Sequence, residues 1–199
     1  MQQLGGLPGG TGTRLMPVPV CMWPQATPRW QAGILLLGLR HAAGTTRDAA
    51  RTRVRQVLLQ LLEVPGCSIE ASAGAGQAPQ IQVPGHARAG LSISHDGDFS
   101  VAAVHLHGPV GVDVMAVQDT ADWRGVASDY LGPQVLARLC AANQAQRARL
   151  FARAWCEREA RLKCAGLGLS EWSPQSQPPA RTLELALPAG LVGALALPV

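Results

Sequence analysis

The chain has 199 residues, of which 47% are hydrophobic and 4% are aromatic, and its formal net charge is +4. This length fits one domain or two small halves that share a sizeable core. Arginine supplies almost all of the positive charge, because Lys163 is the single lysine. The charge suits a polyanionic ligand, an acidic protein partner or nucleic acid. The scattered arginines and the absence of a helix-turn-helix or zinc motif argue against nucleic acid.

Cysteine usage and hydropathy limit the compartment. The five cysteines are odd in number and form no C-x-x-C pair, which favours a reduced, cytoplasmic protein. Apolar runs stay far below membrane-span length, the longest aliphatic cluster being Ile34–Leu37, so we expect no membrane contact. Residues 1–22 are rich in glycine and proline, show no signal-peptide apolar region, and predict an irregular N-terminal tail.

The first regular elements predicted are a strand over Gly33–Leu39 and a helix over Thr46–Leu62. Thr45 or Thr46 can cap this helix. Arg47 and Arg51 lie in its first turns, where cations oppose the helix macrodipole. That placement favours an anion held there, although such a ridge can also be a solvated face.

A hairpin and a buried strand follow, after a short strand near Ile81. The stretch 91–104 predicts a strand, a turn at Asp96-Gly97 and a returning strand, with Ser94 and His95 just before the turn. In the strand 110–115, a period of two puts the valines on one face. The other face carries Gly111, Asp113 and Met115. A lone carboxylate in so apolar a strand needs a metal ion, an arginine or backbone donors.

The C-terminal third predicts a loop over residues 116–134, a helical region over Val135–Ala165 with a break near Asn143, and a closing strand over Thr182–Leu187. Strands and helices in this order indicate an α+β fold.

The helix segment 155–163 carries the most informative residues. Phe151, Trp155 and Leu162 fall on one apolar face, with Glu159 and Lys163 one turn apart at its edge. The Glu159–Lys163 spacing alone is that of an ordinary surface ion pair. Arg158, however, lies within the apolar face, where a guanidinium needs an anion or a carboxylate.

Three segments in this order and spacing resemble the 4′-phosphopantetheinyl transferase superfamily. They are Ser94-His95, Gly111-Val112-Asp113 and Trp155-Cys156-x-Arg158-Glu159-Ala160-x-x-Lys163. The resemblance covers roughly residues 45–172. Within the superfamily, the chain is similar to the Sfp-like branch, in which one chain holds two alike halves. It implies an α+β fold with two similar halves packed as a pseudo-dimer, an N-terminal half over residues 23–108 and a C-terminal half over residues 109–199.

The resemblance also implies an activity: transfer of the 4′-phosphopantetheine arm of coenzyme A to a serine of an apo acyl or peptidyl carrier protein, releasing 3′,5′-ADP, by a monomer. Asp113 and Glu159 would bind Mg²⁺, and Glu159 and Lys163 would be catalytic. The residues implied to bind coenzyme A are Arg47, Arg51, Ser94, His95, Arg158 and Lys163. We expect the carrier to dock on residues 116–134 and the start of the following helix. Val126, Tyr130 and Leu131 would supply apolar contact, and Arg124 and Arg138 would steer the carrier.

This chain departs from the family pattern at two positions of consequence. Met115 stands where Sfp-like enzymes commonly carry a second acid, and a thioether is a poor ligand for Mg²⁺. Gln77 stands where relatives often have a lysine for a phosphate contact. The alternative to an active transferase is therefore a catalytically weak module that binds coenzyme A or a carrier protein.

Overall fold

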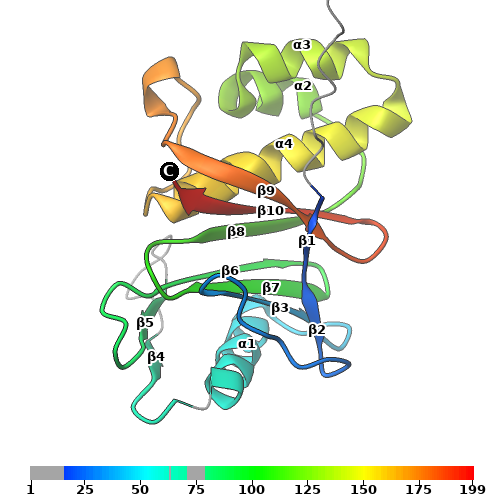
Figure 1. Ribbon diagram of the computed structural model, residues 1–199. Coiled ribbons are helices and arrows are strands. Elements are labelled where there is room, and N and C mark those ends of the chain that lie inside the picture. The colour runs from blue at the N-terminus through cyan, green and yellow to red at the C-terminus, as the bar shows by residue number, and fades with distance from the viewer. Residues whose placement is uncertain (1–15, 63, 71–78) are drawn as a thin grey trace, which may run out of the picture.

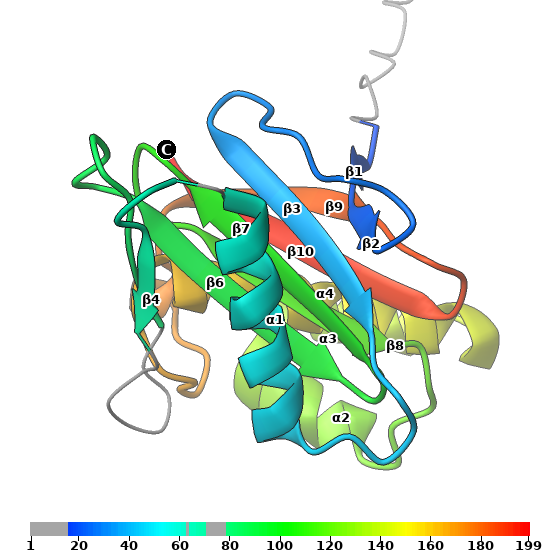
Figure 2. The same ribbon diagram turned by 90° about the horizontal axis from the view of Figure 1, so that it is seen from below.

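A computed structural model describes residues 16–62, 64–70 and 79–199. Its first four-stranded sheet has the order β2-β3-β7-β6, and helix α1 (Arg47–Leu62) covers the outer face (Figures 1 and 2). The strands of this sheet are β2 (Cys21–Trp23), β3 (Ile34–Arg40), β6 (Gly90–Asp96) and β7 (Phe99–His105). A two-stranded sheet, β4 (Ser68–Glu70) with β5 (Gln80–Gln82), lies beside it.

The second four-stranded sheet has the order β1-β9-β10-β8 and carries helix α4 (Gln144–Cys164) on its outer face (Figure 1). Its strands are β1 (Val18–Pro19), β8 (Gly111–Ala116), β9 (Ala180–Ala186) and β10 (Leu191–Pro198). Smaller helical elements complete this side of the molecule: α2 (Trp123–Val126), the π-helix η1 (Ala127–Leu131), α3 (Pro133–Ala141) and the 3-10 turn η2 (Pro174–Ser176).

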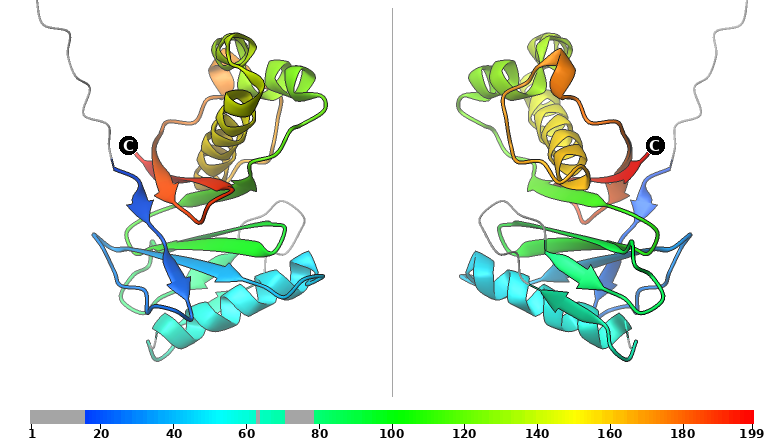
Figure 3. Two further views of the ribbon diagram at one scale, coloured as in Figure 1. Left: turned by 90° about the vertical axis from the view of Figure 1, so that its right-hand side faces the viewer. Right: turned by 90° about the vertical axis from the view of Figure 1, so that its left-hand side faces the viewer.

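The two sheets pack face to face, so that α1 and α4 lie on opposite outer sides of the molecule (Figure 3). Apolar side chains of both sheets fill the space between them, including Phe99, Val101, Val112, Val114 and Leu195. The three valines predicted on one face of the Asp113 strand all belong to this shared core. Burial of that face turns Asp113 toward α4.

Most sequence-predicted elements are confirmed. The strand near Gly33–Leu39 is β3, the Thr46–Leu62 helix is α1, and Ile81 lies in β5. The hairpin is β6 and β7, and a break at Ala142 and Asn143 separates α3 from α4. Thr46 is the capping residue of α1, since its hydroxyl accepts the Ala49 N–H at 3.3 Å.

Three local expectations need correction. Residues 18–19 and 21–23 are short edge strands rather than irregular tail, because β1 pairs in parallel with β9 and β2 pairs in parallel with β3. Residues 1–15 lie outside the described residues. The predicted loop 116–134 contains α2 and η1, whose apolar residues pack against α4. Strand β10 was not predicted at all, although it joins β8 to β9.

Helix α4 has two buried faces, where the sequence predicted one. Phe151 and Trp155 pack toward η1 and α3, as their common face implied. A second face of small residues packs against β8 and β10 and consists of Ala152, Cys156, Ala160 and Cys164, each one turn after the last. Glu159 and Lys163 flank this second face, which brings them over β8.

Candidate active site

Gly111 allows α4 to lie unusually close to β8. A Cβ atom at this position would overlap the carbonyl oxygen of Ala160 and would lie 2.6 Å from the amide nitrogen of Cys164. The helix backbone therefore rests directly on the strand backbone. Because of this close approach, side chains from one turn of α4 reach the strand residue two positions further on, Asp113.

Asp113 is the centre of the site. Its side chain is almost completely buried, with 6% of the residue exposed. Lys163 Nζ donates to Asp113 Oδ1 at 2.7 Å and to the Val112 carbonyl at 3.2 Å. Ser94 Oγ, from the other sheet, donates to the same carboxylate oxygen at 2.6 Å. The partner that the sequence required for this buried carboxylate is thus a lysine and a hydroxyl.

Glu159 provides a second carboxylate beside Asp113. Burial raises the pKa of Glu159, and the negative charge of Asp113 raises it further, while Lys163, Arg158 and Arg47 act in the opposite direction. Among the described residues, no hydrogen bond or ion pair is made by its side chain. A half-buried carboxylate in this situation has unused capacity to accept a proton or to ligate a cation.

Cys156 lies on the same side of α4 but has no reactive character. Burial, followed by the nearby charge of Asp113, raises the pKa of the Cys156 thiol strongly. Its sulfur donates to the Val192 carbonyl at 3.7 Å. Cys156 therefore stays a neutral packing residue.

The seam between the sheets is held by side chains instead of a backbone ladder. β6 and β8 are edge strands of their sheets, and three alternate backbone N–H groups of β8 would lack strand partners. Side-chain oxygens of β6 accept them: Ser92 accepts from Val112 at 3.0 Å, Ser94 from Val114 at 3.4 Å, and Asp96 from Ala116 at 2.6 Å. This seam fixes the position of Ser94 and hence of its contact with Asp113.

Arginines of α1 and histidines of the first sheet lie near the seam. The charges of Arg47 and Arg51 act on His95, and that of Arg47 also reaches Glu159. Burial first, and then the charge of Arg47, lowers the pKa of His95. Its Nδ1 lies 3.0 Å from Ser100 Oγ, which also lies 2.8 Å from His41 Nε2.

His41 and Ser100 were missed by the sequence reasoning. The hairpin register could have found Ser100, because pairing Asp96 with Phe99 places Ser100 opposite His95. For His41, nothing in the sequence indicated its position.

Arg158 has a backbone carbonyl as its hydrogen-bond partner, where the sequence indicated an anion or a carboxylate. It is buried, as its place on the apolar face implied, but its Nη2 donates to the carbonyl oxygen of Ser170 at 2.5 Å. Its Nε has no hydrogen-bond partner within the described part of the chain. The guanidinium therefore anchors the segment that follows α4, and its contact with a phosphate stays a prediction. Gln77 lies outside the described residues.

A cavity of about 580 Å³ opens beside Lys163, between β5 and β6 on one side and the end of α4 on the other. Ile81, Gly90 and Leu91 line it from the N-terminal side, and Cys164 and Gly166 from the end of α4. A ligand held here would have the Lys163 ammonium at its edge.

The described residues contain neither a helix able to cross a membrane nor a group of three or more His, Cys, Asp or Glu side chains arranged for a metal ion. Met115 lies on the Asp113 face of β8, where a third acid would stand, and packs against apolar residues of α4 and η1. Two carboxylates, Asp113 and Glu159, remain as oxygen donors.

Comparison with known proteins points to one family. Residues 109–186 match the model of the 4′-phosphopantetheinyl transferase superfamily. Over 80 residues the chain is 26% identical to a Synechocystis protein named "Putative 4′-phosphopantetheinyl transferase". This match covers 40% of the chain and 32% of that protein, about a third of its length. The family-model match covers less than half of the chain, the part that holds Asp113, Glu159 and Lys163.

Proposed function

We propose that this protein transfers the 4′-phosphopantetheine arm of coenzyme A to a serine of an apo acyl or peptidyl carrier protein and releases 3′,5′-ADP. The observation that carries the proposal is the Asp113–Lys163 pair beside Glu159, at the seam of two sheets and inside the family-matched segment. Each sheet has one long helix on its outer face, which supports the Sfp-like, pseudo-dimeric arrangement. The five free cysteines suit a cytoplasmic setting.

Asp113 and Glu159 would hold Mg²⁺. Magnesium sites in proteins use one or two carboxylates, and water and phosphate oxygens complete the shell. The pair fits this requirement, because both donors are oxygens and Glu159 has no competing partner among the described residues. When bound, Mg²⁺ supplies charge neutralisation to the diphosphate of coenzyme A.

Lys163 and Glu159 would perform the chemical roles. The Lys163 ammonium is fixed by Asp113 and the Val112 carbonyl, so it is oriented before the leaving diphosphate gains charge. Glu159 would accept the proton of the carrier serine as the hydroxyl attacks phosphorus.

The N-terminal half would hold the phosphates. Arg47, Arg51 and His95 are its candidates, because the charge of Arg47 reaches Glu159 and the charges of Arg47 and Arg51 act on His95. Ser94 donates to Asp113, so it would position that carboxylate, beside His95 at the coenzyme A site.

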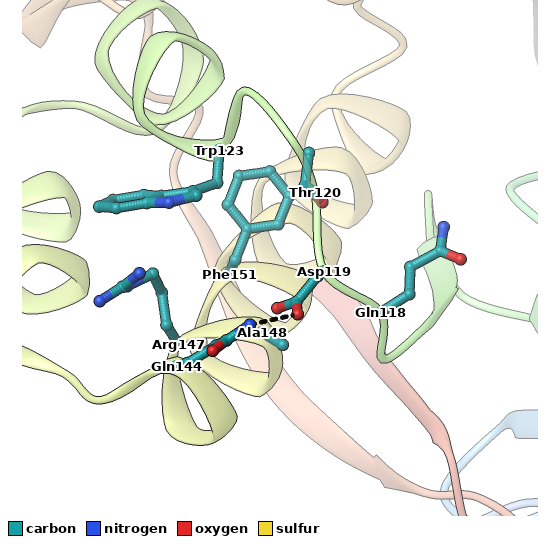
Figure 4. Close-up of a pocket in the computed structure, with 8 residues that line it drawn as sticks. All are labelled: Gln118, Asp119, Thr120, Trp123, Gln144, Arg147, Ala148 and Phe151. Carbon is teal, nitrogen blue, oxygen red and sulfur yellow. Dashed lines mark hydrogen bonds between the residues drawn. The ribbon is translucent and has the colours of Figure 1, made fainter.

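The carrier would dock beside α2, η1 and α3. Trp123 lies between two guanidiniums, with Arg124 at 5.3 Å and Arg147 at 4.6 Å from the ring centre. Figure 4 shows Trp123, Arg147 and Phe151 around a hollow of about 200 Å³, with Asp119 accepting from Gln144 Nε2 at 2.8 Å. Val126 and Tyr130 are partly exposed here, whereas Leu131 is buried and cannot contact a partner as expected.

A catalytically weak binding module is the second candidate, and Met115 favours it. Met115, an apolar residue, occupies the place of a third acid and packs against apolar neighbours. Among the described residues, no other carboxylate completes a three-ligand group. Binding of coenzyme A without transfer would be the expected behaviour.

Intact-mass analysis separates these candidates. An apo carrier protein is incubated with this protein, coenzyme A and Mg²⁺, and a matched reaction contains the Glu159→Gln variant. A mass increase equal to one phosphopantetheine, dependent on Mg²⁺ and absent with Glu159→Gln, is expected. Unmodified carrier together with measurable coenzyme A binding would favour the weak module and refute the transferase.

A further inference from the structure

Two histidines share one buried hydroxyl near the phosphate-facing side of the site. Ser100 on β7 is 0% exposed. Its Oγ lies 2.8 Å from His41 Nε2, just after β3, and 3.0 Å from His95 Nδ1 on β6. Because β7 pairs with both of these strands, the sheet itself holds the three side chains in line. The imidazole ring centres are 5.6 Å apart.

A single hydroxyl couples the proton positions of the two rings. Ser100 has one proton, so it can donate to only one ring while it accepts from the other. If both rings donated, the hydroxyl hydrogen would lack an acceptor in a fully buried place, which is unfavourable. The cluster therefore accommodates one added proton and not two.

The surrounding charges decide which ring takes that proton. Burial lowers the pKa of both histidines, so both are neutral in the free protein near pH 7. The two rings repel each other when both are charged, so the pair does not hold two protons together. A phosphate held by Arg47 and Arg51, whose charges act on His95, would favour the proton on His95 and leave His41 as the neutral acceptor. The charged groups that face the cluster are Arg47, Arg51 and Arg53 from α1 and Asp96 and Asp98 from the β6–β7 turn.

We propose that His41 is a positioning residue that, through Ser100, holds His95 as an imidazolium when a phosphate ligand binds. His95 Nδ1–H donates to Ser100 Oγ, and the Ser100 hydroxyl donates to His41 Nε2. Since Nδ1 is engaged, Nε2–H is the donor that reaches the phosphate. This inference rests on the proposed function for its ligand, coenzyme A, and predicts that ligand binding takes up a proton.

Calorimetry of coenzyme A binding in buffers of different ionisation enthalpy tests the proposal. The wild-type protein is expected to take up close to one more proton per ligand than His41→Leu, and His41→Leu is expected to bind about tenfold more weakly at pH 7. His41→Gln, whose amide oxygen can accept from Ser100, should restore most of the affinity. His105→Leu, at the far end of β7, is the matched control and should behave like wild type.

Ring-nitrogen NMR of the wild-type protein with and without coenzyme A gives an independent measurement. Without ligand, the two rings are expected to take up one proton between them before a second; with coenzyme A bound, His95 is expected to carry protons on both nitrogens, with His41 protonated on Nδ1 only and accepting at Nε2. Protonation of His41 in place of His95, or equal proton uptake by wild type and His41→Leu, would overturn the inference while leaving the transferase proposal intact. If coenzyme A does not bind at all but the coupled titration is seen, the proposed function fails and the histidine coupling stands.

Discussion

Each four-stranded sheet of this molecule forms a unit with one long helix on its outer face, but the two helices pack on their sheets differently. α1 packs on the first sheet through large aliphatic side chains, including Val54, Val57 and Leu58. α4 packs on the second sheet through alanines and cysteines, with Gly111 beneath it. Large side chains hold a helix away from a sheet, whereas small ones let the backbones approach.

This difference in packing explains where the ionisable groups lie. The close approach of α4 puts Glu159 and Lys163 beside Asp113, largely out of water, and pairs charges at 2.7 Å. α1 instead offers arginines at its N-terminal end, of which Arg47 is exposed. One unit therefore supplies buried acid–base groups and the other supplies cations for an anion, and the side chains of β6 join them.

The largest expected effect comes from removing the carboxylates of the second unit. Asp113→Asn and Glu159→Gln should each lower the rate of carrier modification by about a hundredfold or more, since metal binding and proton transfer depend on them. Intact mass gives the rate and circular dichroism checks the fold. Near-normal turnover in either folded variant would refute the assignment of the site, and Glu157→Gln on the same helix serves as the control.

The second effect tests the packing difference itself. Gly111→Ala should destabilise the protein by about 3 kcal/mol, because the added methyl meets the backbone of α4, which cannot yield locally. Gly38→Ala on β3 in the first unit should cost about 1 kcal/mol, because its methyl would meet the ends of the Met22, Phe99 and Val20 side chains. Urea unfolding measures both.

Gly168→Ala is the reference substitution, since nothing lies within 4 Å of a Cβ there. Equal losses at positions 111 and 38 would contradict the view that the second unit is packed backbone to backbone.

Local patterns predicted much of this fold, because they depend on neighbours in the chain. The period of two around Asp113 placed the valines in the core and turned the carboxylate the other way. The hairpin and the capped helix α1 followed from equally local signals. The motif also brought Asp113, Glu159 and Lys163 into one site, as the structure has them.

The features that were missed depend on tertiary contacts. β10 is apolar along almost its whole length, since α4 and the first sheet cover its two faces, so it has no alternation to reveal a strand. The small-residue face of α4 consists of alanines and cysteines. Its hydrophobicity is weak compared with that of Phe151 and Trp155, so the sequence pattern did not reveal it. Arg158 donates to the carbonyl oxygen of Ser170. The sequence could not predict this partner, because only the folded chain places Ser170 beside Arg158.

A smaller effect is a pH dependence of the free energy of unfolding. It follows from the raised pKa of Glu159 and arises in the second unit. Folding raises this pKa above its unfolded value, so the folded state binds the proton more tightly. The resulting stabilisation is complete below the unfolded pKa and is lost as pH rises through the folded one. Urea unfolding from pH 4 to 8 should show this loss in wild type, and Glu159→Gln should remove it. An unchanged pH dependence in the variant would mean that Glu159 is solvated in solution.

The smallest effect concerns Met115, where the second unit lacks an acid. Met115→Glu adds a carboxylate on the Asp113 face of β8 and should lower the Mg²⁺ concentration needed for half-maximal transfer. The gain is limited, because the side chain leaves apolar contacts with α4 and η1 and the new charge lies near two other carboxylates. Met115→Gln is the matched control, since it has the same length without the charge. If both variants shift the metal titration equally, residue 115 acts through packing; a shift confined to glutamate places it in the coordination shell.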